Sequence, residues 1–391
     1  MSRILGLVSA FALALVGLTH VTTPAAGAAA PVRVIVTLAP SADAGGVATS
    51  LVTRRGGVVT HVYEHALNGF AATLTDTLLS VLRGDARVRS VELDRTMRIS
   101  DTQSPTPSWG QDRVDQRNLP LNNSYTYNAT GSAVDAYVVD TGILTTHPDF
   151  GGRAIHGSDA VDGDTNATDC NGHGTHVAGT IGGTSHGLAK QTRLIAVRVL
   201  DCAGSGSTSG VIAGLDWVVA HHQAGKPAVA NMSLGGGASA TLDAAVNRVI
   251  NDGVSMAVAA GNEDADACTT SPARVPNALT VAASDRNDAK ASFSNRGTCV
   301  DLFAPGVDIT SDWLANGTNT ISGTSMAAPH VAGAAALHLQ SNPSATPAQV
   351  STAINGAATP GKVSGTARTC LLLGLFCKPA TPNNRLLYVG G

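Results

Sequence analysis

From residue 109 onward, near-continuous apolar runs alternate with longer stretches of helical period. The apolar runs are residues 133–139, 192–199, 228–232, 254–259 and 279–283. The helical stretches are residues 174–181, 208–222, 238–252 and 325–340. Strands that are apolar along their whole length are buried on both faces, so the alternation predicts an α/β fold with a doubly wound, mostly parallel sheet. Sites in such sheets lie beyond the carboxyl ends of the strands.

The preceding segment has a different pattern. Its strand-like runs are residues 32–38, 57–63, 69–74 and 88–93, and its helical stretches are residues 44–54 and 77–83. The order β-α-β-β-α-β predicts a small α+β domain of the ferredoxin-like type. About seventy residues are just enough for such a domain to fold. Residues 100–108, rich in Ser, Thr, Gln and Pro, are expected to form an exposed linker.

The N-terminus predicts export. Arg3 precedes an apolar run over residues 4–18, and Ala26-Gly27-Ala28 matches an A-x-A cleavage site. We therefore expect a signal peptide over residues 1–28. A membrane anchor is the alternative, but the apolar run is short for a full span. No later stretch is long and apolar enough to cross a bilayer, so we expect a secreted, extracellular protein without a membrane partner.

The composition indicates which classes of partner to expect and whether the cysteines are oxidised. Hydrophobic residues make up 43% of the 391 residues and charged residues 14%, which suits a large core. The net charge of −3 gives no electrostatic reason to expect nucleic acid as a partner. Six cysteines in an exported chain predict disulfides, with free buried thiols as the alternative. Spacing alone leaves fifteen pairings open.

Two polar residues are placed to act together. Asp140 closes the run 133–139, and His173 stands where the helical stretch 174–181 begins. Taken alone, Asp140 is more typical of a turn, but a buried carboxylate can hold a histidine in one tautomer. His173 can then act as a general base near neutral pH. A metal site of His173 and His176 is disfavoured because the HExxH arrangement is absent, and we interpret His176 as a packed helix residue.

Ser325 and Asn262 complete the candidate chemistry. Ser325 stands where a loop becomes a helix, so taken alone it is more typical of a helix cap. The unpaired N–H groups and the positive dipole end found there can also receive the negative charge formed when a serine oxygen attacks a carbonyl. Asn262 follows Ala259-Ala260-Gly261 at a strand end. It is either a turn residue or an amide donor to that charge.

Together these motifs identify a family. Asp140-Thr141-Gly142, His173-Gly174-Thr175-His176 and residues 323–329 (GTSMAAP), in that order, resemble the subtilisin-like serine proteases. The similarity is closest to the proteinase K branch and its aqualysin-like bacterial members. It covers about residues 109–390, and residues 32–98 are similar to the inhibitory propeptide of these enzymes. The resemblance implies a propeptide over residues 29–100 and a catalytic domain over residues 101–391.

The resemblance also implies a role for each candidate residue. Ser325 would be the nucleophile, His173 the base and then the acid, and Asp140 the residue that orients His173. Asn262 and the N–H of Ser325 would form the oxyanion hole. The segments implied to contact substrate are Gly204-Ser205-Gly206, Ser233-Leu234-Gly235 and Ala259-Ala260-Gly261, with surface turns as the alternative for the glycines. The last segment is small and uncharged, which predicts an apolar or aromatic side chain before the cut bond, and no acidic pocket residue is evident.

Structural Ca²⁺ and disulfides are further implications of the resemblance. One calcium site would use the carbonyl oxygens of Pro276 and Ala278 and the carboxylate of Asp301. The residues of a second would be Asp112, Asp115 and Gln116, for which a solvated acidic turn is the alternative. Implied disulfides are Cys170–Cys202 and Cys268–Cys299. Cys370 and Cys377 flank residues 371–376 and can close a small loop, for which the resemblance offers no counterpart.

The sequence thus predicts a secreted serine endopeptidase of broad specificity. We expect a monomer that acts on proteins and peptides, made as a zymogen that cuts itself near Ser100 and Asp101. Its propeptide would serve as intramolecular chaperone and inhibitor. An α/β-hydrolase esterase has the order Ser, Asp, His and a G-x-S-x-G elbow, which this chain lacks. A serine-carboxyl peptidase would need Glu in place of His173. An inactive binding protein is disfavoured because all four catalytic positions hold competent residues.

Overall fold

The computed structural model describes residues 31–65, 67–94, 101–371 and 376–390. They form two compact units, one ending at residue 94 and the other beginning at residue 101. The predicted signal peptide lies outside the described residues, as does Ser100. Among the described helices, none combines the length and the hydropathy needed to cross a membrane.

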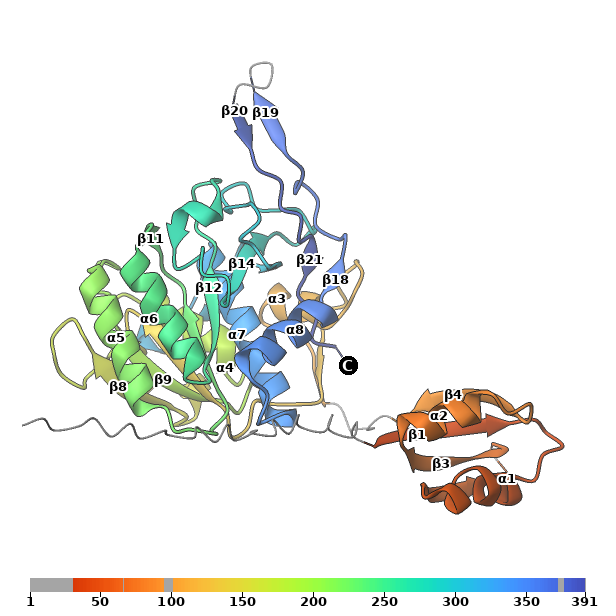
Figure 1. Ribbon diagram of the computed structural model, residues 1–391. Helices are drawn as coiled ribbons and strands as arrows, with labels where there is room; N and C mark the ends of the chain where they lie inside the picture. Colours follow the sequence, from red (N-terminus) through yellow and green to blue (C-terminus); the bar gives the residue numbers. More distant parts are fainter. Residues whose placement is uncertain (1–30, 66, 95–100, 372–375, 391) are drawn as a thin grey trace, which may run out of the picture. The chain divides into compact units, whose positions relative to one another are not determined.

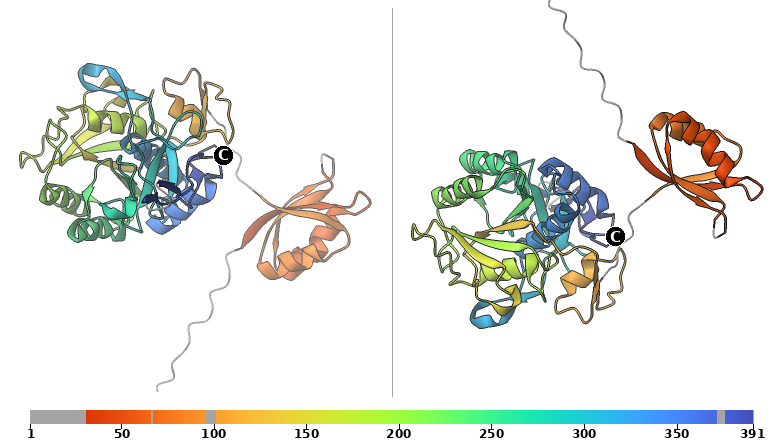
Figure 2. Two further views of the ribbon diagram at one scale, coloured as in Figure 1. Left: turned by 90° about the horizontal axis from the view of Figure 1, so that it is seen from above. Right: turned by 90° about the horizontal axis from the view of Figure 1, so that it is seen from below.

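The smaller unit is a four-stranded antiparallel sheet in the order β2-β3-β1-β4, with two helices on one face (Figures 1 and 2). Its elements are β1 (Val32–Leu38), α1 (Ala44–Leu51), the 3₁₀ turn η1 (Thr53–Arg55), β2 (Val58–Tyr63), β3 (Gly69–Leu74), α2 (Asp76–Arg83) and β4 (Val88–Leu93). Alternate residues of β1, namely Val34, Val36 and Leu38, are buried against both helices. The ferredoxin-like prediction is confirmed, although α1 ends before the expected residue 54.

The larger unit is built on a nine-stranded sheet in the order β18-β21-β15-β14-β12-β10-β7-β9-β8. All neighbours are parallel except β18 and β21, which confirms the predicted mostly parallel sheet. The strands are β7 (Asp135–Asp140), β8 (Ala154–Asp159), β9 (Arg193–Arg198), β10 (Ala228–Met232), β12 (Ser255–Ala259), β14 (Leu279–Ser284), β15 (Leu302–Pro305), β18 (Thr359–Pro360) and β21 (Arg385–Leu386).

Helices cover both faces of this sheet (Figure 1). One layer holds α5 (Thr208–His221) and α6 (Ala240–Asn251), and the other holds α4 (His173–Gly182), α7 (Thr324–Ser341) and α8 (Pro347–Ala357). Successive side chains of a strand point to opposite faces. In β7, Tyr137 and Val139 pack with α5 and α6, whereas Ala136 and Val138 pack with α4 and α7.

Short elements complete the larger unit. The helical ones are α3 (Trp109–Val114), η2 (Pro148–Phe150), η3 (Ala267–Thr269) and η4 (Leu314–Asn316). The strand pairs are β5 (Asp101–Gln103) with β6 (Tyr125–Tyr127), β11 (Gly236–Gly237) with β13 (Thr270–Ser271), β16 (Ile309–Asp312) with β17 (Thr318–Ile321), and β19 (Thr369–Leu371) with β20 (Phe376–Lys378). The β19–β20 hairpin projects from the body of the unit (Figure 1).

The expected linker is only partly a linker. Residues 101–103 form β5, and the Gln103 side chain donates to the Ser185 carbonyl oxygen at 3.0 Å and accepts from Lys190 at 2.7 Å. Composition alone does not reveal this, because the partners of a short polar strand lie far along the chain. Residues 101 and 102 are exposed as expected, but all three residues belong to a paired strand and are not a linker.

The strand order positions the candidate site. Strands β7, β10 and β12 are neighbours, so their carboxyl ends lie side by side at one edge of the sheet. Asp140 is the last residue of β7, Ser233 directly follows β10, and Asn262 lies in the turn after β12. The chain continues from β7 to β8 and β9 on one side of β7 and then crosses to β10 on its other side, which makes this edge a topological switch point.

Candidate active site

Asp140 and His173 form a close pair at this edge. The Asp140 side chain is fully buried, and its Oδ1 lies 2.7 Å from His173 Nδ1. The same Oδ1 accepts the N–H of Thr141 at 2.7 Å, which fixes the carboxylate. Because an ionised carboxylate can only accept, Nδ1 carries the proton and Nε2 is the basic atom of the neutral ring.

The charge around His173 changes its pKa. Burial by itself would lower the pKa of His173, because it disfavours the charged ring. The negative charge and the hydrogen bond of Asp140 act in the opposite direction, as does the charge of Asp169. These contributions together outweigh burial, so the pKa of His173 is raised. The site therefore stabilises the imidazolium form that a general base becomes when it accepts a proton.

Asp169 organises the loop that leads into α4. Its carboxylate accepts a hydrogen bond from Thr141 Oγ1 at 2.9 Å, and it accepts the N–H groups of Asn171, Gly172 and Thr175, each at 2.9 Å. Sequence analysis missed this residue. The available signal was an aspartate four residues before a helix start, where its carboxylate can accept the N–H groups two and three residues later as in an Asx turn.

Two glycines allow α4 to begin so close to β7. A Cβ at Gly174 would lie 2.1 Å from the carbonyl oxygen of Gly142. Gly172 has φ of 106°, and a Cβ there would lie 2.5 Å from the Trp313 ring. Any other residue at either position would push the helix, and His173 with it, away from Asp140.

Ser325 lies in the first turn of α7, and Ser233 fixes it through two hydrogen bonds. Pro329 has no N–H, so the Ser325 carbonyl lacks its usual helical donor. The Ser233 hydroxyl donates to that carbonyl at 2.7 Å, and Ser325 Oγ donates to the Ser233 carbonyl at 3.1 Å. Asn231 Nδ2 in turn donates to Ser233 Oγ at 2.9 Å. Within the described part of the chain, no hydrogen bond joins Ser325 to His173.

Asn262 is tied to the start of the same helix. Its Oδ1 lies 2.8 Å from the N–H and 3.0 Å from the hydroxyl of Thr324. A backbone N–H can only donate, so the atom that faces it must be the amide oxygen, which leaves the NH₂ group available as a donor. Thr324 Oγ1 also accepts the N–H of Gly261 at 3.1 Å. Sequence analysis missed Thr324, which precedes the candidate nucleophile directly.

Two adjoining cavities lie over the site, and both are lined by residues 234–237. The first, of about 570 Å³, is also lined by His173, Ser233 and the expected substrate segment 204–206. The second, of about 410 Å³, is also lined by Ala259, Gly261, Asn262, Thr324 and Ser325. Ala260 does not line either cavity, because it is fully buried in a core cluster with Phe303. The structure thus brings the candidate residues together except for Ala260.

The second cavity contains an acidic residue that sequence analysis did not expect. Glu263 is exposed and lines this cavity. Its Oε2 accepts the N–H of Asn262 and the Nδ2 of Asn295, each at 2.9 Å. The expectation of a pocket without an acidic residue is wrong, because Glu263 in the turn after β12 lines the cavity.

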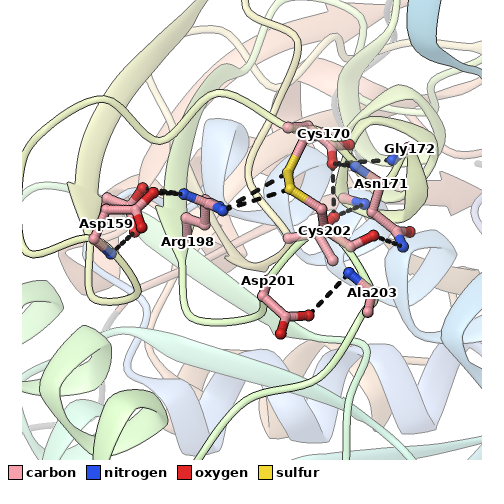
Figure 3. Close-up of a disulfide and its surroundings, with 12 residues drawn as sticks. Asp159, Cys170, Asn171, Gly172, Arg198, Asp201, Cys202 and Ala203 are labelled. Carbon is pink, nitrogen blue, oxygen red and sulfur yellow. Dashed lines mark hydrogen bonds and ion pairs between the residues drawn. A yellow bond between two sulfur atoms is a disulfide. The ribbon is translucent and has the colours of Figure 1, made fainter.

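The disulfide Cys170–Cys202 joins the loop before α4 to the loop that carries residues 204–206 (Figure 3). Asn171 Nδ2 adds a hydrogen bond to the Cys202 carbonyl at 3.0 Å. Arg198 lies against both sulfur atoms and donates to Asp159 at 2.5 Å (Figure 3). The pairs Cys268–Cys299 and Cys370–Cys377 are also present, so all three expected pairings are confirmed.

The carboxylate expected at the first calcium site is held by a residue close in sequence to the other two expected residues. Asp301 Oδ2 accepts the N–H of Thr280, two residues after Ala278, at 2.8 Å. Burial raises the pKa of Asp301 to about 6. A carboxylate next to the carbonyl groups of Pro276 and Ala278 offers only oxygen donors, as Ca²⁺ prefers.

The residues expected at the second calcium site surround one loop. Asp112 accepts the N–H groups of Asn122 and Asn123, at 3.1 and 2.6 Å. Asp115 Oδ1 is buried without a hydrogen-bond partner among the described residues. Burial, and then the charge of Asp112, raises the pKa of Asp115 to about 6. Gln116 Nε2 donates to the carbonyl oxygens of residues 118 and 120. The side-chain oxygen Oε1, which takes no part in these two hydrogen bonds, is the atom that would bind a cation. A buried carboxylate oxygen without a hydrogen-bond partner favours a cation site over the alternative, a solvated acidic turn.

Comparison with known proteins identifies the family. The sequence profile of the Subtilase family matches residues 131–370. The chain belongs to the subtilase family. A second profile, that of peptidase inhibitor I9, matches residues 35–100, which cover most of the smaller unit.

Several relatives of this subtilase are proteases. The extracellular serine proteinase of Thermus sp. (strain Rt41A) is 58% identical over 315 residues, which are 80% of this chain and 76% of that protein. Alkaline serine exoprotease A of Vibrio alginolyticus is 54% identical over 313 residues, which are 79% of this chain but only 58% of that protein. The crystal structure of a cold-adapted subtilisin-like serine proteinase aligns with a TM-score of 0.69, and the two sequences are 53% identical. The alignment covers 74% of this chain and 100% of that chain.

Proposed function

We propose that this subtilase is a secreted serine endopeptidase that cuts peptide bonds with Asp140, His173 and Ser325. The observation that supports this most directly is the pair of the buried Asp140 and His173, 2.7 Å apart. His173 lines the first cavity and Ser325 lines the adjoining second one. The signal-like N-terminus and the extracellular Thermus relative support secretion. We expect a monomer with protein and peptide substrates.

The geometry supports acyl transfer in two steps. Ser325 Oγ turns from the Ser233 carbonyl toward His173, attacks the substrate carbonyl and gives its proton to His173 Nε2. Asp140 stabilises the resulting imidazolium. The oxyanion accepts hydrogen bonds from the Asn262 NH₂ group and from the N–H of Ser325. The intermediate then collapses to an acyl-enzyme while His173 protonates the departing amine. A water molecule then attacks the ester carbonyl and gives a proton to His173, which passes it to Ser325 Oγ as the acid product leaves.

The cavities support a substrate bound as an extended strand. The edges 204–206 and 233–235 offer backbone groups to a peptide, and the 410 Å³ cavity would take the side chain before the cut bond. Its small residues Ala259 and Gly261 favour an apolar or aromatic side chain. Glu263 lines this cavity, and the N–H of Asn262 and the Nδ2 of Asn295 donate hydrogen bonds to one of its carboxylate oxygens. Peptides with Phe, Leu, Lys or Arg at that position, cut by wild type and Glu263→Gln, would test this preference. A lysine or arginine preference that Glu263→Gln abolishes would contradict it.

The smaller unit is proposed to be a propeptide that assists folding and inhibits the enzyme. Its match to peptidase inhibitor I9 and its own hydrophobic core support this role. Strand β5 begins at Asp101, close to the expected self-cleavage position. Structural Ca²⁺ is proposed at Pro276, Ala278 and Asp301 and at Asp112, Asp115 and Gln116. It would neutralise carboxylates there and take no part in the chemical steps.

Replacing the nucleophile tests the activity and the zymogen together. Ser325→Ala removes the attacking oxygen, so we expect a secreted precursor that still carries residues 29–100 in covalent linkage. Mass spectrometry of the secreted protein measures this. Ser255→Ala is the control, because it makes the same change at a buried serine of β12 whose hydroxyl has no hydrogen-bond partner among the described residues. Normal self-cleavage of Ser325→Ala would contradict the proposed function.

A further inference from the structure

Three ionisable side chains meet near the C-terminal end of α4, at the opposite end of the helix from His173. Asp149 belongs to η2, His186 to the loop after α4, and Asp312 is the last residue of β16. One potential ligand atom from each lies within 4.8 Å of the other two. His186 Nδ1 is 2.9 Å from Asp312 Oδ1 and 3.4 Å from Asp149 Oδ2. The side chains of Asp149 and His186 are each 9% exposed, and that of Asp312 is fully buried.

Asp312 lacks the partners that a buried carboxylate needs. Neither of its oxygens has a hydrogen-bond partner with good geometry among the described residues, and its 2.9 Å contact with His186 is an ion pair that requires a protonated ring. An ionised carboxylate that is buried without compensation is costly. Gly179 and Gly183 make room for it, because a Cβ at these positions would lie 2.6 and 3.0 Å from Asp312 Oδ2.

We propose that Asp149, His186 and Asp312 bind one Zn²⁺ ion, separately from the expected calcium sites. An imidazole nitrogen with two carboxylate oxygens is a donor set that Zn²⁺ accepts, whereas Ca²⁺ prefers oxygen alone. Ligand bonds of about 2.0–2.1 Å in a tetrahedron place ligand atoms about 3.3 Å apart. The separations of 2.9 and 3.4 Å at His186 Nδ1 lie close to that value. Water can take the fourth position through the exposed edges of Asp149 and His186.

His147 borders the cluster but is already engaged. Its Nδ1 accepts the N–H of Asp149 at 3.2 Å, and its Nε2 lies 3.1 Å from the Gly317 carbonyl oxygen. Asp149 Oδ1 similarly accepts the N–H of Ser185 at 2.8 Å, and Oδ2, which accepts the N–H of His186 at 3.4 Å, has a further lone pair for the ion. These contacts hold the ligand-bearing segments in place as outer partners of metal ligands do.

The site would connect two elements of the catalytic machinery. Helix α4 begins with His173, and the β16–β17 hairpin, which contains Asp312, leads directly to the start of α7 and Ser325. An ion bound by Asp312 and by the segments at the end of α4 would fix the hairpin against that helix. Its effect is expected on stability rather than on a chemical step.

Zinc titration of the mature enzyme tests the proposal. The wild type is blocked with a serine-reactive sulfonyl fluoride to prevent autolysis, stripped with a chelator, and returned to excess Ca²⁺ so that oxygen-ligand sites stay filled. Calorimetry with ZnCl₂ should show one ion per chain, and Tm should rise by several degrees. His186→Gln and Asp312→Asn should each weaken binding at least about tenfold. His156→Gln, an exposed histidine of β8, should bind as the wild type does.

A crystal soaked in ZnCl₂ should show an anomalous peak between the three side chains, which gives a result even where a variant fails to fold. Absence of zinc binding by the wild type would overturn the proposal, and the cluster would then be an imidazolium held between two carboxylates. Unchanged stoichiometry and affinity in both His186→Gln and Asp312→Asn would also overturn it, because the ion would then bind elsewhere.

Discussion

In the proposed mechanism His173 must be neutral to accept the proton of Ser325, so its pKa would set the acidic limit of activity. Asp140 and Asp169 raise that pKa above the ordinary value of about 6.5 despite burial. We therefore expect kcat/KM to fall as the pH falls through this raised pKa, with the acidic limb above pH of about 6.5. Replacing Asp140 with Asn should move the limb to lower pH and reduce kcat by about 10⁴.

A pH profile with a chromogenic peptide measures both effects. Asp252→Asn is the control, because Asp252 also pairs with a histidine, His222 at 2.9 Å, but lies at the C-terminus of α6, away from the site. It should leave the profile unchanged. An acidic limb that stays in place in Asp140→Asn would show that Asp140 does not control His173.

Ser233 gives a second prediction for a single residue. Its hydroxyl replaces the N–H that Pro329 cannot offer to the Ser325 carbonyl. Ser233→Ala leaves that carbonyl without a donor, and we expect the free energy of unfolding to fall by about 1–2 kcal/mol. With the nucleophile less firmly placed, kcat should fall about tenfold while KM changes little.

Denaturant unfolding and steady-state kinetics measure these two quantities. Ser255→Ala removes a buried hydroxyl that makes no hydrogen bond and should be close to neutral in both. An equal loss in the two variants would indicate that only packing, and not the hydrogen bond to Ser325, is involved.

Among the elements, the loops before α4 and after β9 act as a pair because Cys170–Cys202 joins them. This disulfide spans 32 residues, so chain entropy predicts a loss of about 3–4 kcal/mol when both cysteines become serine. The loop 200–206 forms one edge of the first cavity. We therefore expect a lower Tm together with a higher KM for extended peptides.

Replacing Cys370 and Cys377 by serine provides the comparison. That disulfide spans only 7 residues and joins β19 to β20, a two-stranded hairpin of its own. We expect kcat/KM to stay at the wild-type value in this variant. The same rise in KM in both double variants would contradict a link between Cys170–Cys202 and the substrate edge.

At the scale of the whole molecule, calcium is expected to govern stability. An ion that binds only the folded chain stabilises it by about 2.7 kcal/mol at one hundred times its Kd. A chelator should therefore lower the Tm of the mature enzyme by several degrees, and added Ca²⁺ should restore it. Asp115→Asn removes the proposed carboxylate ligand whose Oδ1 is buried, so the Tm of this variant should respond less to the chelator.

Calorimetric scans with and without the chelator check this. Asp216→Asn changes an exposed aspartate of α5 and should respond as the wild type does. If the Tm of the wild type is independent of Ca²⁺, the proposed calcium sites are wrong.

The sequence by itself determined the architecture and the candidate catalytic residues. Burial repeats locally along a strand or helix, so the runs at 69–74 and 228–232 match β3 and β10 residue for residue. Short motifs at Asp140, His173 and Ser325 carry their chemistry within a few residues and needed no contacts to be noticed. The pairs Cys170–Cys202 and Cys268–Cys299 followed from the resemblance, whereas Cys370–Cys377 followed from the short loop that these two cysteines can close.

Only the tertiary structure decided which polar atoms meet. Ser233 and Ser325, or Asp149 and Asp312, lie on segments far apart in the sequence, and no periodicity reports their contact. For the same reason the sequence did not reveal that Thr324 fixes the Asn262 amide or that Glu263 turns toward the pocket. Hydrophobic patterning follows from burial, which each residue experiences separately. A hydrogen bond or a metal site requires two or three side chains at defined distances, and only the folded chain sets those distances.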